Sequence, residues 1–370
     1  MINYSSWLHR FNRRTKMIRK TTLILLAIGL LLGFTVPALA DGMLVHPANV
    51  YPPLPGGKFI EPDQRCFIID AGDGYEALAL QVSFGKADLK EFGWLIPLPA
   101  VPEVKPVGQE LFDALYGVTY RAPLYYGGGG GCGGGGNGVM PVPEPAKDTG
   151  GVDYLDRQVV GNYDVFTVAA ETPDDLKTWI EDNGYVLPEG DAYKSVFQRY
   201  IDKDWIFVAI KVHLPDEIPW YDGYTGYDYS PIQYGVLHPL FFLFKSDELI
   251  YPMLISKLNG GATDLTMYVL ASHKMRFKDS KQKWAGWVKE ADFTDGSPLE
   301  FYVKGTQFMT KLRRVYFWDK DYDADLYLLQ AADDKEDREA QAEIPTNFLM
   351  LGFLAFGFPI YGRLKKRKSN

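Results

Sequence analysis

Aromatic side chains concentrate in one short segment, residues 220–234, whose sequence is WYDGYTGYDYSPIQY. Aspartate, glycine and serine separate the rings, so carboxylates and hydroxyls flank them. Rings and short polar groups together suit the faces and hydroxyls of sugars, or the side chains of a peptide partner. The alternative is a long hairpin or loop whose tyrosines pack over a sheet edge. The candidate ligand-binding residues are Trp220, Tyr221, Asp222, Tyr224, Tyr227, Asp228 and Tyr229.

Four aspartates occupy alternate positions further along the chain. Calcium-binding loops use this spacing to arrange carboxylate oxygens around one ion. The match is incomplete, because Ala324 stands where such a loop requires glycine and Gln330 replaces its bidentate glutamate. The alternative is an acidic turn between two strands, and the sequence suggests no cofactor other than calcium. The candidate calcium ligands are Asp319, Asp321, Asp323 and Asp325.

The common enzyme motifs are absent from the chain. It has no GxSxG elbow, no HExxH and no phosphate-binding loop. The histidines have no metal-ligand spacing, and His213 and His273, at the ends of predicted strands, are expected to be surface residues. The sequence therefore favours a protein that is not an enzyme. It leaves open an envelope hydrolase that acts through a carboxylate pair which no motif reveals.

The N-terminal end carries an export signal. Residues 1–40 contain basic side chains, then an apolar run from Thr21 to Val36, then small residues around Leu39. This order predicts a signal peptide that is cleaved after Ala40. An uncleaved N-terminal anchor is the alternative.

The C-terminal end carries a second membrane signal. Residues 344–362 are long enough, at about 28 Å as a helix, to cross the hydrocarbon core of a bilayer. The basic tail at 363–370 follows the run and places the C-terminus in the cytoplasm. We therefore expect a single-pass protein of the cell membrane whose folded part is extracytoplasmic. A buried core helix and a processed sorting signal are the alternatives.

The net charge of −8 is unevenly distributed, because basic residues cluster at the two ends and leave the middle of the chain strongly acidic. Such a surface repels phosphate backbones, and no basic patch interleaved with aromatics offsets it. Nucleic-acid binding is therefore excluded, and cationic or neutral partners are favoured.

The chain has two cysteines, Cys66 and Cys132. An even pair in an oxidising compartment favours a disulfide. Cys132 lies among nine glycines, where no packed core is expected, because glycine loses the most backbone entropy on ordering. A Cys66–Cys132 bridge would hold this glycine-rich loop beside the first strand. An exposed, reactive Cys132 and a cysteine without a role are the alternatives.

Alternating apolar positions predict a half-buried strand at 76–84, with Leu78 and Leu80 on one face and Ala77 and Ala79 on the other. Similar patterns predict strands at 65–70, 92–98, 163–168, 205–213, 249–257, 264–272, 312–318 and 325–329. Helices are predicted at 108–118, from Thr172 to Gly184 and at 191–202. Thr172 is the expected N-cap of the second, with proline in its first turn.

These patterns predict a β-rich α+β fold, an antiparallel sheet or sandwich with two or three short helices, plus the C-terminal transmembrane helix. The expected segments are a signal peptide (1–40), an extended Pro/Gly arm (41–62), a first β-rich lobe (63–126), a flexible Gly/Pro-rich loop (127–151), a second α+β lobe (152–332), an acidic spacer (333–343), the transmembrane helix (344–362) and the basic tail (363–370).

Several short motifs occur once each along the chain, and their order is characteristic. They are WLIPLPAVPE at 94–103, VGNY at 160–163, LKTWIEDNGY at 176–185, WIFVAIKV at 205–212, and HPL at 238–240 with YPMLIS at 251–256. As a set they resemble the bacterial family called domain of unknown function 2330, over residues 41–276. The resemblance implies an exported protein, often with a C-terminal membrane segment, and it implies no activity and no catalytic residues.

Together these features predict an extracytoplasmic, membrane-anchored envelope protein that acts as a binding or scaffolding module. Its partner would be an envelope protein or glycan, in addition to the membrane that holds its C-terminal helix. An envelope hydrolase and a purely structural envelope protein remain as alternatives.

Overall fold

A computed structural model describes residues 42–47, 63–85, 91–120, 150–214, 234–259, 263–293, 296–316 and 319–338. All of these residues belong to one compact unit, Ala38–Asn370. The predicted signal peptide, transmembrane helix and basic tail lie outside the described residues. Within the described ranges, the helices are all too short or too polar to cross a bilayer.

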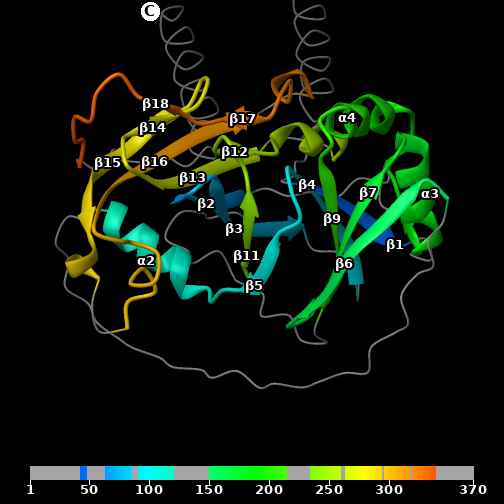
Figure 1. Ribbon diagram of the computed structural model, residues 1–370, viewed down its shortest axis with the longest axis horizontal. Coiled ribbons are helices and arrows are strands. Elements are labelled where there is room, and N and C mark those ends of the chain that lie inside the picture. Colours follow the sequence, from blue (N-terminus) through cyan, green and yellow to red (C-terminus); the bar gives the residue numbers. More distant parts are fainter. Residues whose placement is uncertain are drawn as a thin grey trace, which may run out of the picture. The chain divides into compact units, whose positions relative to one another are not determined.

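The first sheet has six strands in the order β6-β7-β9-β4-β1-β8, and Figure 1 labels all of them except β8. Each neighbouring pair is antiparallel. The strands are β1 (Met43–Pro47), β4 (Glu91–Leu98), β6 (Val152–Val160), β7 (Tyr163–Ala170), β8 (Tyr185–Val186) and β9 (Ile206–His213).

The second sheet has eight strands, in the order β15-β16-β13-β2-β3-β11-β5 with β10 paired to β3. It is mixed, because β2 and β13 run parallel. The strands are β2 (Asp63–Gly72), β3 (Tyr75–Gly85), β5 (Glu103–Pro106), β10 (Tyr234–Val236), β11 (Leu240–Lys245), β13 (Thr263–Ala271), β15 (Lys281–Lys289) and β16 (Thr306–Tyr316).

Shorter elements complete the described part of the chain. The α-helices are α2 (Glu110–Thr119), α3 (Pro173–Asp182) and α4 (Ala192–Ile201), and the 3-10 helices are η2 (Met253–Leu258), η3 (Glu290–Asp292) and η4 (Asp319–Asp321). Two small ribbons pair β12 (Ile250–Tyr251) with β17 (Leu326–Tyr327) and β14 (Met275–Arg276) with β18 (Leu329–Gln330).

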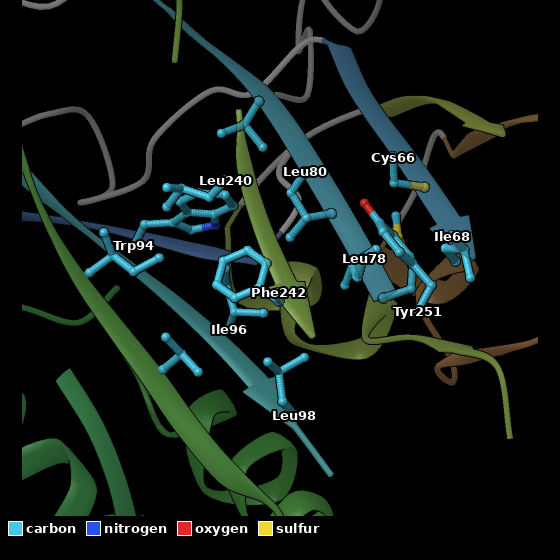
Figure 2. Packing of buried hydrophobic residues seen from close by; sticks show 14 of the residues in the cluster. Cys66, Ile68, Leu78, Leu80, Trp94, Ile96, Leu98, Leu240, Phe242 and Tyr251 are labelled. Atoms are coloured by element: carbon cyan, nitrogen blue, oxygen red, sulfur yellow. The ribbon is translucent and has the colours of Figure 1, made fainter. Parts of the chain in front are cut away.

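The main core lies between the two sheets. Figure 2 shows Trp94, Ile96 and Leu98 of β4 opposite Leu240 and Phe242 of β11, within one buried cluster. A second cluster packs α3 and α4 against the outer face of the six-stranded sheet. A third packs α2 against the outer face of the eight-stranded sheet. The domain is therefore a two-sheet sandwich with helices on both outer faces, which confirms the predicted β-rich α+β class.

Strand β3 is buried on both faces. Leu78 and Leu80 face the main core as the alternation predicts, but Ala77 and Ala79 are also buried, in the cluster that contains Leu111 of α2. Small alanine side chains let the helix approach the sheet closely. The prediction of a half-buried strand was therefore wrong, because the face with the small residues is covered by α2 and is not exposed to solvent.

Helix α3 begins as its sequence predicts. The Thr172 hydroxyl oxygen accepts a hydrogen bond from the Asp175 backbone N–H at 3.2 Å, and Pro173 occupies the first turn. The buried stripe contains Leu176, Trp179 and Ile180. These contacts satisfy an amide that the helix itself leaves unpaired.

The predicted strand at 249–257 is wrong beyond its first residues. Only Ile250–Tyr251 forms a strand, and the 3-10 helix η2 follows after Pro252. The N–H groups of Leu254 and Ile255 donate to side-chain oxygens of Asp325 and Tyr200, at 3.1 and 3.0 Å. Pro252 has no N–H to donate to a neighbouring strand. The side chains of Asp325 and Tyr200 then accept the hydrogen bonds that a neighbouring strand would otherwise accept.

Both sheets combine strands from either side of the glycine-rich segment, since β4 pairs with β9 and β2 pairs with β13. The predicted lobes, 63–126 and 152–332, therefore contribute to the same two sheets. Part of the predicted arm, Met43–Pro47, is strand β1.

The first residues of the predicted acidic spacer pack on the domain. Asp337 exchanges backbone hydrogen bonds with Ala285 of β15, at 2.7 and 2.8 Å. The Lys274 ammonium contacts the Asp333 carboxylate at 2.5 Å, and the Lys274 N–H donates to Asp334 at 2.8 Å. Residues 333–338 thus follow the sheet edge, and 339–343 lie outside the described residues.

Candidate functional site

The outer face of the six-stranded sheet changes character along its strands. Outward-facing Val168 and Phe207 pack under α3 and α4 in an apolar cluster. Further along the same strands, the outward positions carry Asp164 and Lys211. We define the polar patch as Glu91, Asp164, Tyr185, Lys211 and His213.

Strand pairing brings four members of the polar patch together. Lys211 of β9 is paired with Asp164 of β7 on one side and with Gly93 of β4 on the other. His213 and Glu91 form the next cross-strand pair. Directly paired residues lie on the same face of an antiparallel sheet, so these side chains share one surface.

The charged members of the polar patch are linked to one another. The Lys211 ammonium lies 3.1 Å from Glu91 Oε2. The His213 imidazole lies between two carboxylates, with Nε2 at 3.2 Å from Asp164 Oδ2 and Nδ1 at 3.9 Å from Glu91 Oε2. Side-chain exposure is 47% for His213 and 37% for Glu91 but only 11% for Asp164. The cluster therefore has an accessible rim and a nearly buried acid.

Tyr185 completes the polar patch from β8. A Cβ on Gly93 would lie 3.3 Å from Tyr185 Cδ1 and 2.4 Å from Val45 Cγ2, so the glycine makes room for the tyrosine ring on the sheet. Burial, together with the charges of Glu91 and Asp164, raises the pKa of the Tyr185 hydroxyl. The hydroxyl thus lies in the field of both carboxylates and stays protonated.

The Tyr185 hydroxyl is buried and has no hydrogen-bond partner within the described part of the chain. The residue as a whole is 8% exposed. Burying a hydroxyl without a partner costs about 1–3 kcal/mol. An ordered water or a ligand that reaches the hydroxyl would satisfy it.

The candidate residues of the aromatic segment, Trp220 to Tyr229, lie outside the described residues. In the sequence, Trp220 comes seven positions after His213, the last residue of β9. The ligand-binding prediction for these residues stays a prediction.

The four candidate calcium ligands occupy different surroundings. Asp319 and Asp321 are the first and last residues of the 3-10 helix η4. Asp323 lies 3.6 Å from the Lys278 ammonium, and Asp325 is buried. The described residues contain no group of three or more acidic, histidine or cysteine side chains placed to hold a metal. The calcium hypothesis therefore receives no support from this geometry.

Asp325 takes part in a buried network on the helix-covered half of the sheet. Its Oδ1 accepts hydrogen bonds from the Tyr200 hydroxyl at 2.7 Å and the Leu254 N–H at 3.1 Å, and its Oδ2 lies 3.2 Å from the Lys203 ammonium. Burial first, and then the Asp325 charge, raise the pKa of Tyr200. The network therefore attaches Asp325, the residue just before β17, to helix α4.

Cys66 is fully buried on β2 in the main core. Its proposed partner Cys132 lies outside the described residues. The disulfide therefore remains a prediction.

Sequence analysis did not select Glu91, Asp164, Tyr185 or Lys211, and it took His213 for an ordinary surface residue. A signal was present in the strands themselves. On β9 the outward positions change from Phe207 and Ala209 to Lys211 and His213. Such a change marks the point where helix cover ends.

A helix-flanked sandwich with a polar patch on one sheet face is the class that fold and site define. The family model described as "Uncharacterized protein conserved in bacteria (DUF2330)" matches residues 55–328. The chain belongs to this family, as the motifs predicted. No curated protein matches the chain.

Comparison with solved structures gives distant matches. The crystal structure of baculovirus P35 is 10% identical, with 75% of this chain and 95% of that chain covered and a TM-score of 0.28. The caspase-8/P35 complex is 9% identical, with 77% and 94% covered and the same TM-score. A likeness at this TM-score supports no conclusion about this chain.

Proposed function

We propose that this protein is an extracytoplasmic, membrane-anchored binding module of the bacterial envelope, and that the polar patch is its binding surface. The observation that carries the proposal is the buried Tyr185 hydroxyl without a partner in the described chain, beside two carboxylates. Patch residues are partly exposed on a sheet face that the helices leave open.

The ends of the chain support the location. An apolar run with a small-residue cleavage site precedes the domain, and an apolar run with a basic tail follows it. A processed protein would begin at Asp41. N-terminal sequencing of the protein from washed membranes checks this start, and intact residues 1–40 would contradict the cleaved signal peptide.

One observation favours the hydrolase alternative. His213 lies between Asp164 and Glu91, and imidazole with carboxylates can transfer protons. However, the Glu91 carboxylate also contacts the Lys211 ammonium at 3.1 Å, so an ion pair already engages it. The arrangement therefore fits binding better than acid–base chemistry.

In-cell photocrosslinking tests the proposal. Val159 is paired with Asp164 on the same sheet face and is 57% exposed, so a photoreactive residue at this position lies beside the polar patch. Phe301, 78% exposed in the segment that packs with α2, is the matched control position.

We expect a discrete adduct with an envelope component from position 159 and none from position 301. The adduct should disappear when Lys211 and His213 are both changed to alanine, and it should persist with Lys105→Ala, a matched exposed lysine on β5. Adducts that are equal at both positions, or absent at 159, would contradict the proposal.

A further inference from the structure

Two properties of the polar patch define what it can bind. The first is that its charged groups already have partners: the Lys211 ammonium contacts Glu91, and the His213 imidazole contacts Asp164 and Glu91. A cationic ligand would compete with Lys211 for Glu91, and an anionic ligand would face two carboxylates. A neutral ligand that both donates and accepts hydrogen bonds disturbs neither pair.

The second property is that four of the five patch residues project from interior strands. A bound peptide typically pairs its backbone with an open strand edge. In the polar patch, however, β4, β7 and β9 are interior strands whose backbones are already paired on both sides, and only the two-residue strand β8 lies at the end of the sheet. Carboxylates, a tyrosine hydroxyl and an ammonium on a sheet face match the hydroxyl groups of a sugar, each of which donates one hydrogen bond and accepts others.

We propose that the polar patch binds a neutral saccharide, whose hydroxyls donate to the Asp164 and Glu91 carboxylates and pair with the Tyr185 hydroxyl. This inference rests on the proposed function and names the ligand class of the same surface. Tyr185 is the residue through which this inference can be tested, because its hydroxyl is buried and has no partner in the described chain.

The test measures binding of the full-length protein in detergent to four tetrasaccharides by calorimetry and saturation-transfer NMR. Cellotetraose and chitotetraose are neutral, the chitosan tetramer is cationic, and tetragalacturonate is anionic. We expect saturable binding of at least one neutral tetramer, and about tenfold weaker binding of both charged ones.

The variant Tyr185→Phe removes only the hydroxyl. It should weaken binding of the neutral tetramer about tenfold, while Tyr75→Phe, a matched change at an exposed tyrosine, leaves binding unchanged. The melting temperature of Tyr185→Phe should stay the same or rise, because no internal hydrogen bond is lost. A lower melting temperature would show a structural role instead and would count against the proposal.

Failure to bind either neutral tetramer, tighter binding of a charged one, or unchanged binding by Tyr185→Phe would overturn the saccharide proposal. These outcomes remain distinct from failure of the proposed function. A protein adduct from position 159 would keep the polar patch as a binding surface while refuting the sugar, whereas no adduct would refute both.

Discussion

The two halves of one sheet face use buried tyrosines in opposite ways. Under α3 and α4, the Tyr200 hydroxyl donates to Asp325 and accepts from the Ile255 N–H. In the polar patch, the Tyr185 hydroxyl has neither kind of partner within the described residues. The Tyr200 hydroxyl of α4 therefore stabilises the fold, whereas the Tyr185 hydroxyl of β8 is the one that we assign to a ligand.

The largest effect is expected from a truncation under the helices. Phe197 is fully buried, and its ring lies 5.7 Å from that of Phe207. Phe197→Ala should lower the free energy of unfolding by about 3–5 kcal/mol, because it leaves a cavity. His213→Ala in the polar patch is the matched control and should change it by less than about 0.5 kcal/mol. Urea unfolding measures both, and similar losses would refute the division of this face.

The next effect comes from the partnered tyrosine. Tyr200→Phe removes two hydrogen bonds, the one donated to Asp325 Oδ1 and the one accepted from the Ile255 N–H, while Asp325 Oδ1 keeps its bond from the Leu254 N–H. The loss should be about 2–3 kcal/mol, since one of the two bonds is made to a charged group. A change below about 0.5 kcal/mol would show that water replaces the hydroxyl and that the network does not stabilise the fold.

Gly93 tests the contact between Tyr185 and the sheet. Gly93→Ala places a methyl group 2.4 Å from Val45 Cγ2 and should destabilise the protein by about 1–3 kcal/mol. Gly117→Ala is the matched control in α2, where a Cβ meets nothing within 4 Å, and it should stabilise by about 0.5–1 kcal/mol. Thermal unfolding of both variants measures the difference, and a harmless Gly93→Ala would mean that Val45 and the Tyr185 ring do not pack this closely over Gly93.

Glu76 extends the comparison to the main core. Its side chain is fully buried, Oε2 accepts the Ile250 N–H at 2.9 Å, and burial raises its pKa well above the ordinary value of 4.5. The folded state therefore holds this proton more tightly than the unfolded state does. Stability from this group is fully present below about pH 4 and falls as the pH rises toward the folded pKa.

Glu76→Gln keeps the shape and removes the titration. As the pH rises above 4.5, the ordinary pKa of a glutamate, the free energy of unfolding of Glu76→Gln should exceed that of the wild type by a growing margin. Urea unfolding from pH 4 to pH 9 measures this, with Glu103→Gln as the exposed control. Parallel pH profiles for wild type and Glu76→Gln would contradict the assignment.

Local features could be predicted from the sequence. The threonine, proline and acids at 172–175 determine the start of α3, and the alternation in β3 marks its core face, because these signals depend on neighbours in the chain. The family motifs likewise lie within single elements. The cover of β3 by α2 and the 3-10 turn after Pro252 depend on partners far away in sequence, so no local pattern predicts them.

The polar patch could not be predicted for the same reason. Glu91, Asp164 and Lys211 lie on three strands separated by long intervals, and only the pairing of β4, β9 and β7 makes them neighbours. Tyr185 reaches them from a two-residue strand next to β1. By contrast, the aromatic segment was noticed because its residues are consecutive, and whether it binds a ligand remains a prediction.

The most direct test of the central claim compares Tyr185→Phe with Tyr200→Phe in two measurements on the full-length protein: the free energy of unfolding and the binding of the neutral tetrasaccharide. We predict that Tyr185→Phe unfolds at the same or higher urea concentration and binds about tenfold more weakly. Tyr200→Phe should unfold at lower urea concentration and bind normally while folded. If Tyr185→Phe lost stability and kept its binding, the polar patch would be a structural feature and not a binding surface.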